Sequence, residues 1–364
     1  MSSVTSRIVL FGATGYTGEL TARALARRGA TTVLAGRNGA ALARLAKQFG
    51  DTETAVADAT DPAAVRALLQ PGDVLVSTVG PFLKLGQAAV SAAAEVGAHY
   101  LDSTGEGPFI RSVFEQHGPV AERNGATLLT GFGYDFVPGN LAGALALEDA
   151  PDATGVDVCY LVRDFGTSGG TRASVVGVML EDGYAFSGGR LRAVRPGSQV
   201  RRFEVSGRAV SGISVSGTEQ LGLPASYAGL RDVGVFLAVP SRAARAFALS
   251  GLAMTPVRRI APLRAVASGL ADRLVKGSTG GPSEEQRSRT GVEVVGEASR
   301  DGRVVGRSHL RGTDPYDFTA EILAWGATTA AEGGLKATGA RGPVEAFGLD
   351  ALAEGCAEAG LRRV

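Results

Sequence analysis

Side chains suited to acid–base chemistry follow three consecutive β-branched runs within the first 140 residues. Each run is predicted to be a strand of one parallel sheet, and the carboxyl ends of parallel strands meet at one edge. We therefore expect these side chains to border a single crevice. Lysine and tyrosine can donate a proton there, whereas a carboxylate can orient a donor or stabilise a cation. The candidate catalytic residues are Lys84, Asp102, Glu106, Tyr134 and Asp135.

Each candidate also has a purely structural interpretation. Thr104 and Glu106 precede Pro108, an order that is typical of a helix cap. Asp135 could instead hold its own turn through backbone N–H groups. Both interpretations stay open for every member of the group. We expect His99 inside a buried strand rather than in catalysis.

A glycine-rich turn carries the clearest binding signal. The sequence GATGYTG follows the apolar run Arg7–Phe11 and opens an alanine-rich helical stretch. Gly12 permits a tight turn, Gly15 lets the backbone approach a ligand, and Gly18 lets the helix pack closely on the sheet. Backbone N–H groups at such a helix start bind a dinucleotide pyrophosphate, although a glycine turn without a nucleotide is the alternative. The expected contacts are Gly12, Ala13, Thr14, Gly15, Tyr16, Thr17 and Gly18.

The end of the second predicted strand indicates NADPH rather than NADH. An NAD enzyme usually places Asp or Glu there to accept from the ribose 2′-OH. This chain has Arg37 and Asn38 instead, and a guanidinium suits a 2′-phosphate by charge and by bidentate hydrogen bonding. A solvated arginine at a helix start is the alternative. By topology, the adenine and nicotinamide contacts are expected at Asp58, Thr78, Val79, Gly80 and Pro81.

The elements that must position these residues alternate between strand and helix as far as residue 130. This alternation of strands and helices predicts an α/β fold with a doubly wound parallel sheet of the Rossmann type. The predicted strands are Arg7–Phe11, Thr32–Ala35, Thr54–Ala57, Val74–Val79, His99–Asp102 and Thr127–Thr130.

Longer strand-like runs after Gly139 predict a second α+β domain built on a mixed, largely antiparallel sheet. Two of these runs flank Asp301-Gly302, a hairpin signal, and Lys276–Arg289 is predicted to be a mobile loop. The runs are Val156–Val162, Val200–Val205, Val233–Val239, Val292–Glu297 and Arg303–Arg311, with helical stretches near Arg172–Leu180 and Arg242–Leu274. We predict an NADP-binding Rossmann domain over 1–140, a substrate and dimerisation domain over 141–315, and C-terminal helices over 316–364. Those helices, Asp317–Ala331 and Leu349–Ala359, are expected to pack back on the first domain or on the junction.

Composition narrows the class of protein. The chain of 364 residues is long enough for two domains with separate cores. Its 37 basic and 36 acidic residues balance, which gives no case for nucleic acid as a partner. Cys159 and Cys356 lie far apart, and neither they nor the three histidines form a metal-binding or disulfide pattern. No apolar run approaches the ~18 residues of a spanning helix, and no signal peptide is recognisable, so we expect a cytoplasmic protein without a transmembrane segment.

Several segments together resemble the saccharopine dehydrogenase-like oxidoreductases, including the branch called trans-acting enoyl reductases. They are GATGYTG, AGRN, STVGPF, HYLDSTGE, GFGYDFVPGNL, SGGTRAS, GPSEEQRSRTG and GTDPYDFTAEIL, and they span nearly the whole chain. The resemblance implies an NADPH-binding fold whose second domain contributes substrate contacts and can form a homodimer. It does not imply saccharopine as the substrate, because members of this branch are functionally scattered.

Three functions remain open. The first is an NADPH-dependent reductase of a C=C bond conjugated to a carbonyl, acting on a small-molecule or acyl substrate that is carrier-bound or lipid-like. It needs a proton donor such as Tyr134 or Lys84. The second is an amino-acid type of imine reductase, which needs a carboxylate from Asp102, Glu106 or Asp135. The third is a non-catalytic NADPH sensor or scaffold.

A basic stretch between Ser241 and Lys276 points to a partner. It carries seven basic residues against the single acid Asp272, with apolar residues interspersed. A basic amphipathic helix of this kind could receive an acidic carrier protein or lie at a membrane surface. An ordinary helix with a solvated charged face is the alternative.

Overall fold

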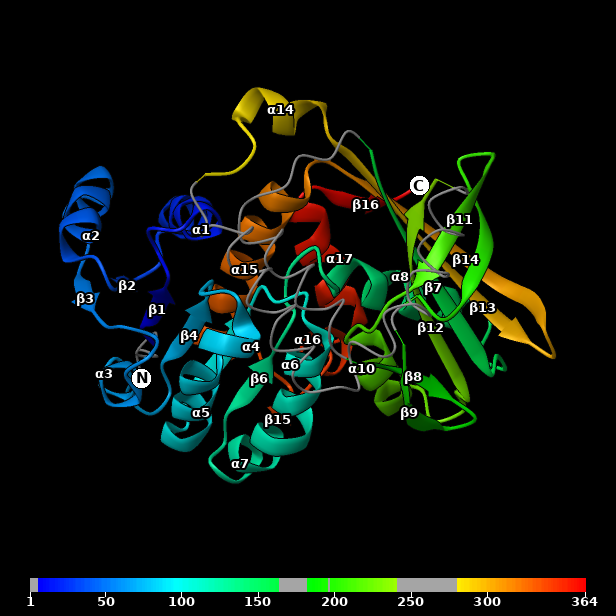
Figure 1. Ribbon diagram of the computed structural model, residues 1–364, viewed down its shortest axis with the longest axis horizontal. Coiled ribbons are helices and arrows are strands. Elements are labelled where there is room, and N and C mark those ends of the chain that lie inside the picture. Colours follow the sequence, from blue (N-terminus) through cyan, green and yellow to red (C-terminus); the bar gives the residue numbers. More distant parts are fainter. Residues whose placement is uncertain (1–5, 164–181, 196, 241–279) are drawn as a thin grey trace, which may run out of the picture.

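A computed structural model describes residues 6–163, 182–195, 197–240 and 280–364. The described chain forms two β-sheets that lie side by side, with helices around the first and between the two (Figure 1). The stretch 241–276, the helical prediction near Arg172–Leu180 and the SGGTRAS motif lie outside the described residues.

The first sheet has seven strands, all parallel, in the order β15-β6-β5-β4-β1-β2-β3. This confirms the predicted α/β class with a Rossmann-type sheet, and the six predicted strands all form. The strands are β1 (Ile8–Phe11), β2 (Thr32–Gly36), β3 (Thr54–Val56), β4 (Val74–Ser77), β5 (His99–Asp102), β6 (Thr127–Leu129) and β15 (Gly339–Ala340). The seventh strand, β15, comes from the C-terminal part of the chain and was not predicted.

Helices cover both faces of this sheet because strand side chains alternate between them. Ile8 and Leu10 of β1 belong to one apolar cluster, together with Leu25 and Leu42. Phe11, on the opposite face, belongs to a second cluster with residues of α3 and α5. The helices between the strands of this sheet in the first 130 residues are α1 (Tyr16–Arg27), α2 (Gly39–Ala46), α3 (Pro62–Arg66), α4 (Phe82–Leu85), α5 (Gln87–Val96), α6 (Gly107–Ser112) and α7 (Gly118–Arg123).

The second sheet is mixed and mostly antiparallel, as predicted. Its main path runs β10-β11-β12-β7-β13-β14-β16, where only the β12–β7 pair is parallel, and β8 and β9 extend from β12. The strands are β7 (Gly155–Arg163), β8 (Gly183–Ser187), β9 (Arg190–Val194), β10 (Val200–Val205), β11 (Arg208–Ser214), β12 (Asp232–Val239), β13 (Gly291–Arg300), β14 (Arg303–Gly312) and β16 (Leu361–Arg363). Asp301 and Gly302, both at positive φ (51° and 75°), form the predicted hairpin turn between β13 and β14.

Helix α8 (Val137–Glu148) lies against one face of the second sheet and is buried over almost its whole length. Two glycines allow this close approach. A Cβ on Gly296 would lie 2.4 Å from the carbonyl oxygen of Ala142, and one on Gly306 would lie 2.4 Å from that of Ala146. The second sheet therefore needs these glycines to pack on a helix of mainly small and aliphatic residues.

The C-terminal helices connect the two sheets. Helix α15 (Pro315–Ala331) packs against α1 and the first sheet, whereas β16 pairs with β14 in the second sheet. Helices α10 (Glu219–Ser226), α16 (Pro343–Phe347) and α17 (Leu349–Glu358) pack around α8 between the sheets (Figure 1). Both predicted C-terminal helices form, while the division into three units at 140 and 315 remains a proposal.

The prediction of a mobile loop over Lys276–Arg289 is wrong for residues 284–289. Residues Glu284–Arg289 form helix α14, which begins with a capping box. The Ser283 hydroxyl accepts a hydrogen bond from the Gln286 N–H (3.2 Å), and the Gln286 side chain accepts one from the Ser283 N–H (2.9 Å). The spacing of serine and glutamine was a helix-start signal that outweighs the polar composition of the segment.

Two further predictions can be compared with the described residues. Cys159 and Cys356 are buried free thiols, consistent with the expected absence of a disulfide framework. In the described ranges, no helix is both long enough and apolar enough to cross a membrane.

Candidate functional site

The glycine turn between β1 and α1 has a shape that only glycine can provide at two positions. Gly12 has a φ of +90°, and a Cβ there would lie 2.7 Å from Thr78 Oγ1. A Cβ on Gly18 would lie 2.1 Å from the Gly12 carbonyl oxygen. The N–H groups of Gly12 and Ala13 both donate to the carbonyl of Ala35 (2.9 and 3.1 Å), which fastens the turn to β2.

The start of α1 is open to solvent at the third glycine. Gly15 is exposed and stands at the N-cap position, where no side chain caps the helix. A Cβ on Gly15 would meet only the Gly12 carbonyl oxygen within 4 Å, at 3.3 Å, so free space surrounds it on the outer side. Uncapped N–H groups at the positive end of a 12-residue helix, beside such space, fit a pyrophosphate.

The residues expected at the adenine end lie at the carboxyl ends of β2 and β3. Arg37 is exposed directly after β2, and Asn38 caps α2 by accepting from the Ala41 N–H at 3.0 Å. The Asp58 carboxylate accepts from the N–H and hydroxyl of Thr60 (2.8 and 2.7 Å). These bonds lower the pKa of Asp58, and the charge of Arg37 lowers it further. Arg37 and Asp58 therefore interact electrostatically across this end of the sheet.

The segment expected near the nicotinamide is held to the glycine turn. The Thr78 hydroxyl donates to the carbonyls of Phe11 and Gly12, at 3.2 Å to each. Val79 also lies against the turn, because a Cβ on Gly12 would be 2.9 Å from Val79 Cγ2. Thr78 and Val79 are thus in contact with the glycine turn, at the carboxyl ends of β4 and β1. Cofactor contacts at these positions remain a prediction.

Two predicted catalytic carboxylates make contacts that hold the backbone. Both oxygens of Glu106 accept backbone hydrogen bonds, from Phe82 N (2.8 Å) and Leu83 N (2.9 Å), at the start of α4. Asp102 Oδ1 accepts from the N–H groups of Thr104 (2.8 Å) and Gly131 (2.9 Å), which joins the ends of β5 and β6. Both carboxyl groups are buried, and burial raises the pKa of Asp102 to about 6. These contacts favour their structural interpretation.

Asp135 lies where a substrate could reach it. Its side chain is exposed to solvent, yet the protein atoms packed around it raise its pKa to about 6. A Cβ on Gly105 would lie 3.4 Å from Asp135 Oδ2, so this carboxyl group borders the loop that follows β5. Lys84, on the short helix α4, is also exposed.

Tyr134 lies deeper than predicted. Its side chain is buried, and burial raises the pKa of its hydroxyl well above 10. Among the described residues, this hydroxyl has no hydrogen-bond partner. Its ring contacts Tyr160 edge-on, with 5.6 Å between centroids, and Phe318 at 6.3 Å. Tyr134 therefore offers a neutral hydroxyl that a substrate can meet only if the surrounding side chains move.

The structure adds a carboxyl group that was not predicted. Glu219, the first residue of α10, is fully buried and accepts a 2.6 Å hydrogen bond from the Tyr160 hydroxyl. The Tyr160 oxygen in turn accepts from the Gly139 N–H (2.8 Å). Burial, with a smaller contribution from the charge of Asp135, raises the pKa of Glu219 to about 8. Neither α10 nor this carboxyl group was predicted, because Tyr160 and Gly139, which surround Glu219, lie on other elements.

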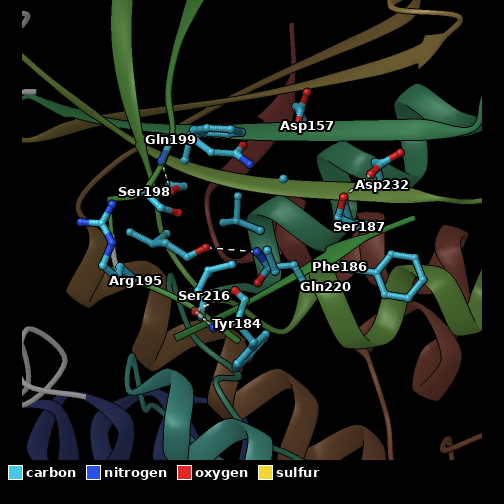
Figure 2. Close-up of a pocket in the computed structure, with 18 residues that line it drawn as sticks. Asp157, Tyr184, Phe186, Ser187, Arg195, Ser198, Gln199, Ser216, Gln220 and Asp232 are labelled. Carbon is cyan, nitrogen blue, oxygen red and sulfur yellow. Dashed lines mark hydrogen bonds between the residues drawn. The ribbon is translucent and has the colours of Figure 1, made fainter. Parts of the chain in front are cut away.

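A separate open pocket lies at the second sheet, between β8 and the strands β11 and β12 (Figure 2). Polar side chains such as Arg195, Gln199 and Asp232 line it. Its wall includes Tyr184, whose hydroxyl donates to the Gly217 carbonyl (3.0 Å) two residues before Glu219. None of the predicted site residues lines this pocket, so it is distinct from the carboxyl edge of the first sheet where those residues lie.

Comparisons with known proteins agree with this geometry. Residues 8–129 match the family model described as the saccharopine dehydrogenase NADP binding domain. A relative from Mycobacterium tuberculosis is 37% identical over 184 residues, which cover 47% of this chain and 44% of the relative. The trans-acting enoyl reductase of Mycobacterium leprae is 36% identical over 185 residues, which cover 48% of this chain and 44% of that protein. The aligned part thus spans less than half the length of these curated relatives.

The solved structure of saccharopine dehydrogenase (L-Glu forming) from Saccharomyces cerevisiae shares the fold. It matches with a TM-score of 0.60 over 99% of this chain and 100% of that chain, at 12% identity. Together the matches confirm the predicted resemblance to saccharopine dehydrogenase-like oxidoreductases and to the enoyl reductase branch. The family model also supports NADP(H) as the cofactor class of the first domain.

Proposed function

We propose that this chain is an NADPH-dependent reductase of a C=C bond conjugated to a carbonyl. One observation carries the proposal: the uncapped start of α1 at Gly15 opens beside residues 78–81, at the carboxyl edge of a parallel sheet. Dinucleotides bind at this edge in open α/β sheets. When bound there, NADPH supplies a hydride to a substrate in the crevice.

The exposed guanidinium of Arg37 supports NADPH over NADH. It stands at the end of β2, where the ribose of the adenosine half lies in such folds. An arginine there complements the 2′-phosphate by charge and by hydrogen bonding. A carboxylate at the same place would accept from the 2′-OH of NADH instead.

The proton needed after hydride transfer is assigned to the Asp135 side of the crevice. Asp135 is exposed, and its pKa near 6 suits a group that exchanges protons near neutral pH. Tyr134 lies next to it in sequence and remains protonated throughout the neutral range.

The names of the relatives support an acyl substrate carried by another protein. The Mycobacterium leprae relative is called a trans-acting enoyl reductase. We propose an acyl substrate on an acidic carrier protein, a cytoplasmic location and homodimer formation for this chain. An imine reductase of amino-acid type and a non-catalytic NADPH sensor are the competing functions.

The test is anaerobic NADPH oxidation against three substrate classes: enones, unsaturated acyl thioesters and cyclic imines. We expect turnover with the enones or thioesters and none with the imines. Turnover of imines alone would support the competing enzyme. NADPH binding by fluorescence titration without any turnover would support the sensor, and absence of binding would refute all three functions.

A further inference from the structure

The first residue of α1 is held by a segment from the other end of the chain. Tyr16 donates a 2.6 Å hydrogen bond through its hydroxyl to the carbonyl of Pro282. Arg287 donates through one guanidinium nitrogen to the Tyr16 hydroxyl (2.9 Å) and to the Pro282 carbonyl (3.1 Å), and through Nε to Asp317 (2.8 Å). We call these four residues, Tyr16, Pro282, Arg287 and Asp317, the Tyr16 latch.

The Tyr16 ring is enclosed as well as hydrogen-bonded. A Cβ on Gly281 would lie 2.6 Å from the ring, so residue 281 must be glycine for the segment to approach this closely. Tyr316 contacts the same ring edge-on, with centroids 5.1 Å apart and planes at 87°. The hydroxyl uses its single proton and an acceptor site within the latch. Tyr16 therefore has one well-defined orientation.

The latch joins the glycine turn to the second sheet. Pro282 and Arg287 belong to the segment 281–289, which leads through α14 into β13, and β13 pairs with both β7 and β14. Figure 1 shows α14 above α1 and connected to the long strand β13. Asp317 lies in the first turn of α15, the helix that packs along α1. Helices α14 and α15 thus both contact α1 at Tyr16, the residue that follows Gly15.

Arg287 differs from its neighbour on the same helix. Its side chain is 12% exposed and bonds to α1, to α15 and to the loop before α14, whereas Arg289 is 73% exposed and, within the described part of the chain, pairs with Glu285 of its own helix. Arg289 is therefore a surface residue whose guanidinium is mostly in solvent. The contacts of Arg287 instead converge on the first turn of α1, away from the apolar residues Leu25 and Ala22 that anchor this helix to the core. Removing Arg287 should therefore loosen that turn more than it destabilises the fold.

We infer that Arg287 is a positioning residue of the cofactor site, which holds residues 281–289 on Tyr16 so that the first turn of α1 keeps its pyrophosphate-binding shape. This inference rests on the proposed NADPH site. It extends that site to residues 281–289, because their contact with Tyr16 would raise the affinity of the glycine turn for NADPH. By linkage, NADPH binding must also tighten the latch.

The test compares Arg287→Met with the matched control Arg289→Met. We expect Arg287→Met to weaken NADPH binding about five- to thirtyfold in a fluorescence titration, and Arg289→Met to leave it unchanged. Adenosine 2′,5′-bisphosphate, which lacks the pyrophosphate, should bind both variants like the wild type. Tyr16→Phe should weaken NADPH binding as well, and the double variant Tyr16→Phe/Arg287→Met should be no weaker than Arg287→Met alone.

Two outcomes would overturn the inference. One is unchanged NADPH affinity in Arg287→Met, and the other is an equal loss for NADPH and the bisphosphate with a lowered unfolding midpoint, which would assign a merely structural role. Amide hydrogen exchange at residues 15–19 of the cofactor-free protein tests the latch separately. Exchange should rise in Arg287→Met and not in Arg289→Met. If wild type does not bind NADPH, the proposed function fails, and faster exchange would still establish the contact.

Discussion

The Tyr160 hydroxyl donates a 2.6 Å hydrogen bond to Glu219 Oε1, and the carboxyl group that receives it is fully buried. Among the described residues, no cation contributes to the electrostatics of Glu219. Burial therefore favours the neutral acid, whose pKa rises from 4.5 to about 8.

Glu219→Gln should stabilise the protein relative to wild type as the pH rises. Between pH 4.5 and about 8 the folded protein keeps a proton on Glu219 that the unfolded chain releases. The folded state then binds more protons, so the free energy of unfolding falls with pH by up to about 1.4 kcal/mol per unit. A glutamine still accepts from Tyr160 and does not titrate. Urea unfolding at pH 5, 6, 7 and 8 measures the difference, with exposed Glu354→Gln as the control. Parallel curves for wild type and Glu219→Gln would contradict the protonated state.

Arg37→Asp should reverse the cofactor preference. Loss of one charge-assisted contact to the 2′-phosphate costs about 1.5–3 kcal/mol, or roughly ten- to a hundredfold in NADPH affinity. NADH binding should persist, because aspartate can accept from its ribose 2′-OH. Arg44→Asp, at an exposed position of α2, is the charge-matched control. Equal affinity of wild type for both cofactors in a fluorescence titration would refute the role of Arg37.

Gly15→Val should abolish dinucleotide binding without unfolding the protein. Its Cβ has only one neighbour within 4 Å, so the fold can accept a side chain that fills the space meant for pyrophosphate. Gly291→Val is the control, since a Cβ there meets nothing within 4 Å and lies outside the crevice. Circular dichroism and NADPH titration of both variants decide the matter. Retained binding in Gly15→Val would remove the argument for a phosphate cradle.

Tyr134→Phe and Lys84→Met should separate alkene reduction from imine reduction. Hydride addition to an enone places negative charge on the carbonyl oxygen, and losing a donor there costs ~2.7–4 kcal/mol, about a hundred- to a thousandfold in kcat. Asp102→Asn should be milder, because an amide oxygen can still accept from the Thr104 and Gly131 N–H groups. Single-turnover rates at saturating NADPH measure these effects.

An imine reductase would give the reverse order. Its activity would survive the loss of both donors and fall when Asp102 or Glu106 is neutralised, whereas neutralising Asp135 lowers the rate under either function. If none of these five substitutions affected turnover, the sensor function would be favoured.

The pH dependence of reduction should follow Asp135. A proton donor acts in its acid form, so the rate should fall as pH rises through about 6, where this carboxyl group loses its proton. Asp135→Asn should lower the rate and remove this step from the profile. Asp350→Asn, at an exposed position of α17, should keep the wild-type profile. A profile that keeps its step near pH 6 in Asp135→Asn would assign the proton transfer to another group.

Local patterns were sufficient to predict most of the first domain. β-Branched runs and glycine spacing are properties of short segments, and all six predicted strands form with the glycine turn between β1 and α1. The strands β8, β9 and β11 were missed, although Gly188, Gly189 and Gly207 stand at positive φ (62°, 75° and 71°) in the turns beside them. Those glycines are typical hairpin signals, but the short strands around them carry several arginines and little alternation.

The contacts within the site depended on tertiary structure. Glu219, Tyr160 and Gly139 lie on three elements, and no spacing in the sequence links them. A Cβ on Gly139 would lie 2.1 Å from Glu219 Oε1, which explains a glycine of the GFGYDFVPG motif only after the chain has folded. Likewise, the carboxylates of Asp102 and Glu106 satisfy backbone N–H groups of neighbouring loops, a demand that the sequence does not reveal.

The position of β15 has a consequence for synthesis on the ribosome. The first sheet obtains its seventh strand and the helix that packs along α1 from residues 315–340, after the whole second sheet except β16 has been translated. About 210 residues separate β6 from β15, which at ~5–20 residues per second means roughly 10–40 s of elongation. During that interval the nascent chain leaves the edge of β6 unpaired, a surface that invites chaperone binding or aggregation. Completion of the nucleotide-binding half therefore has to follow translation of the other half.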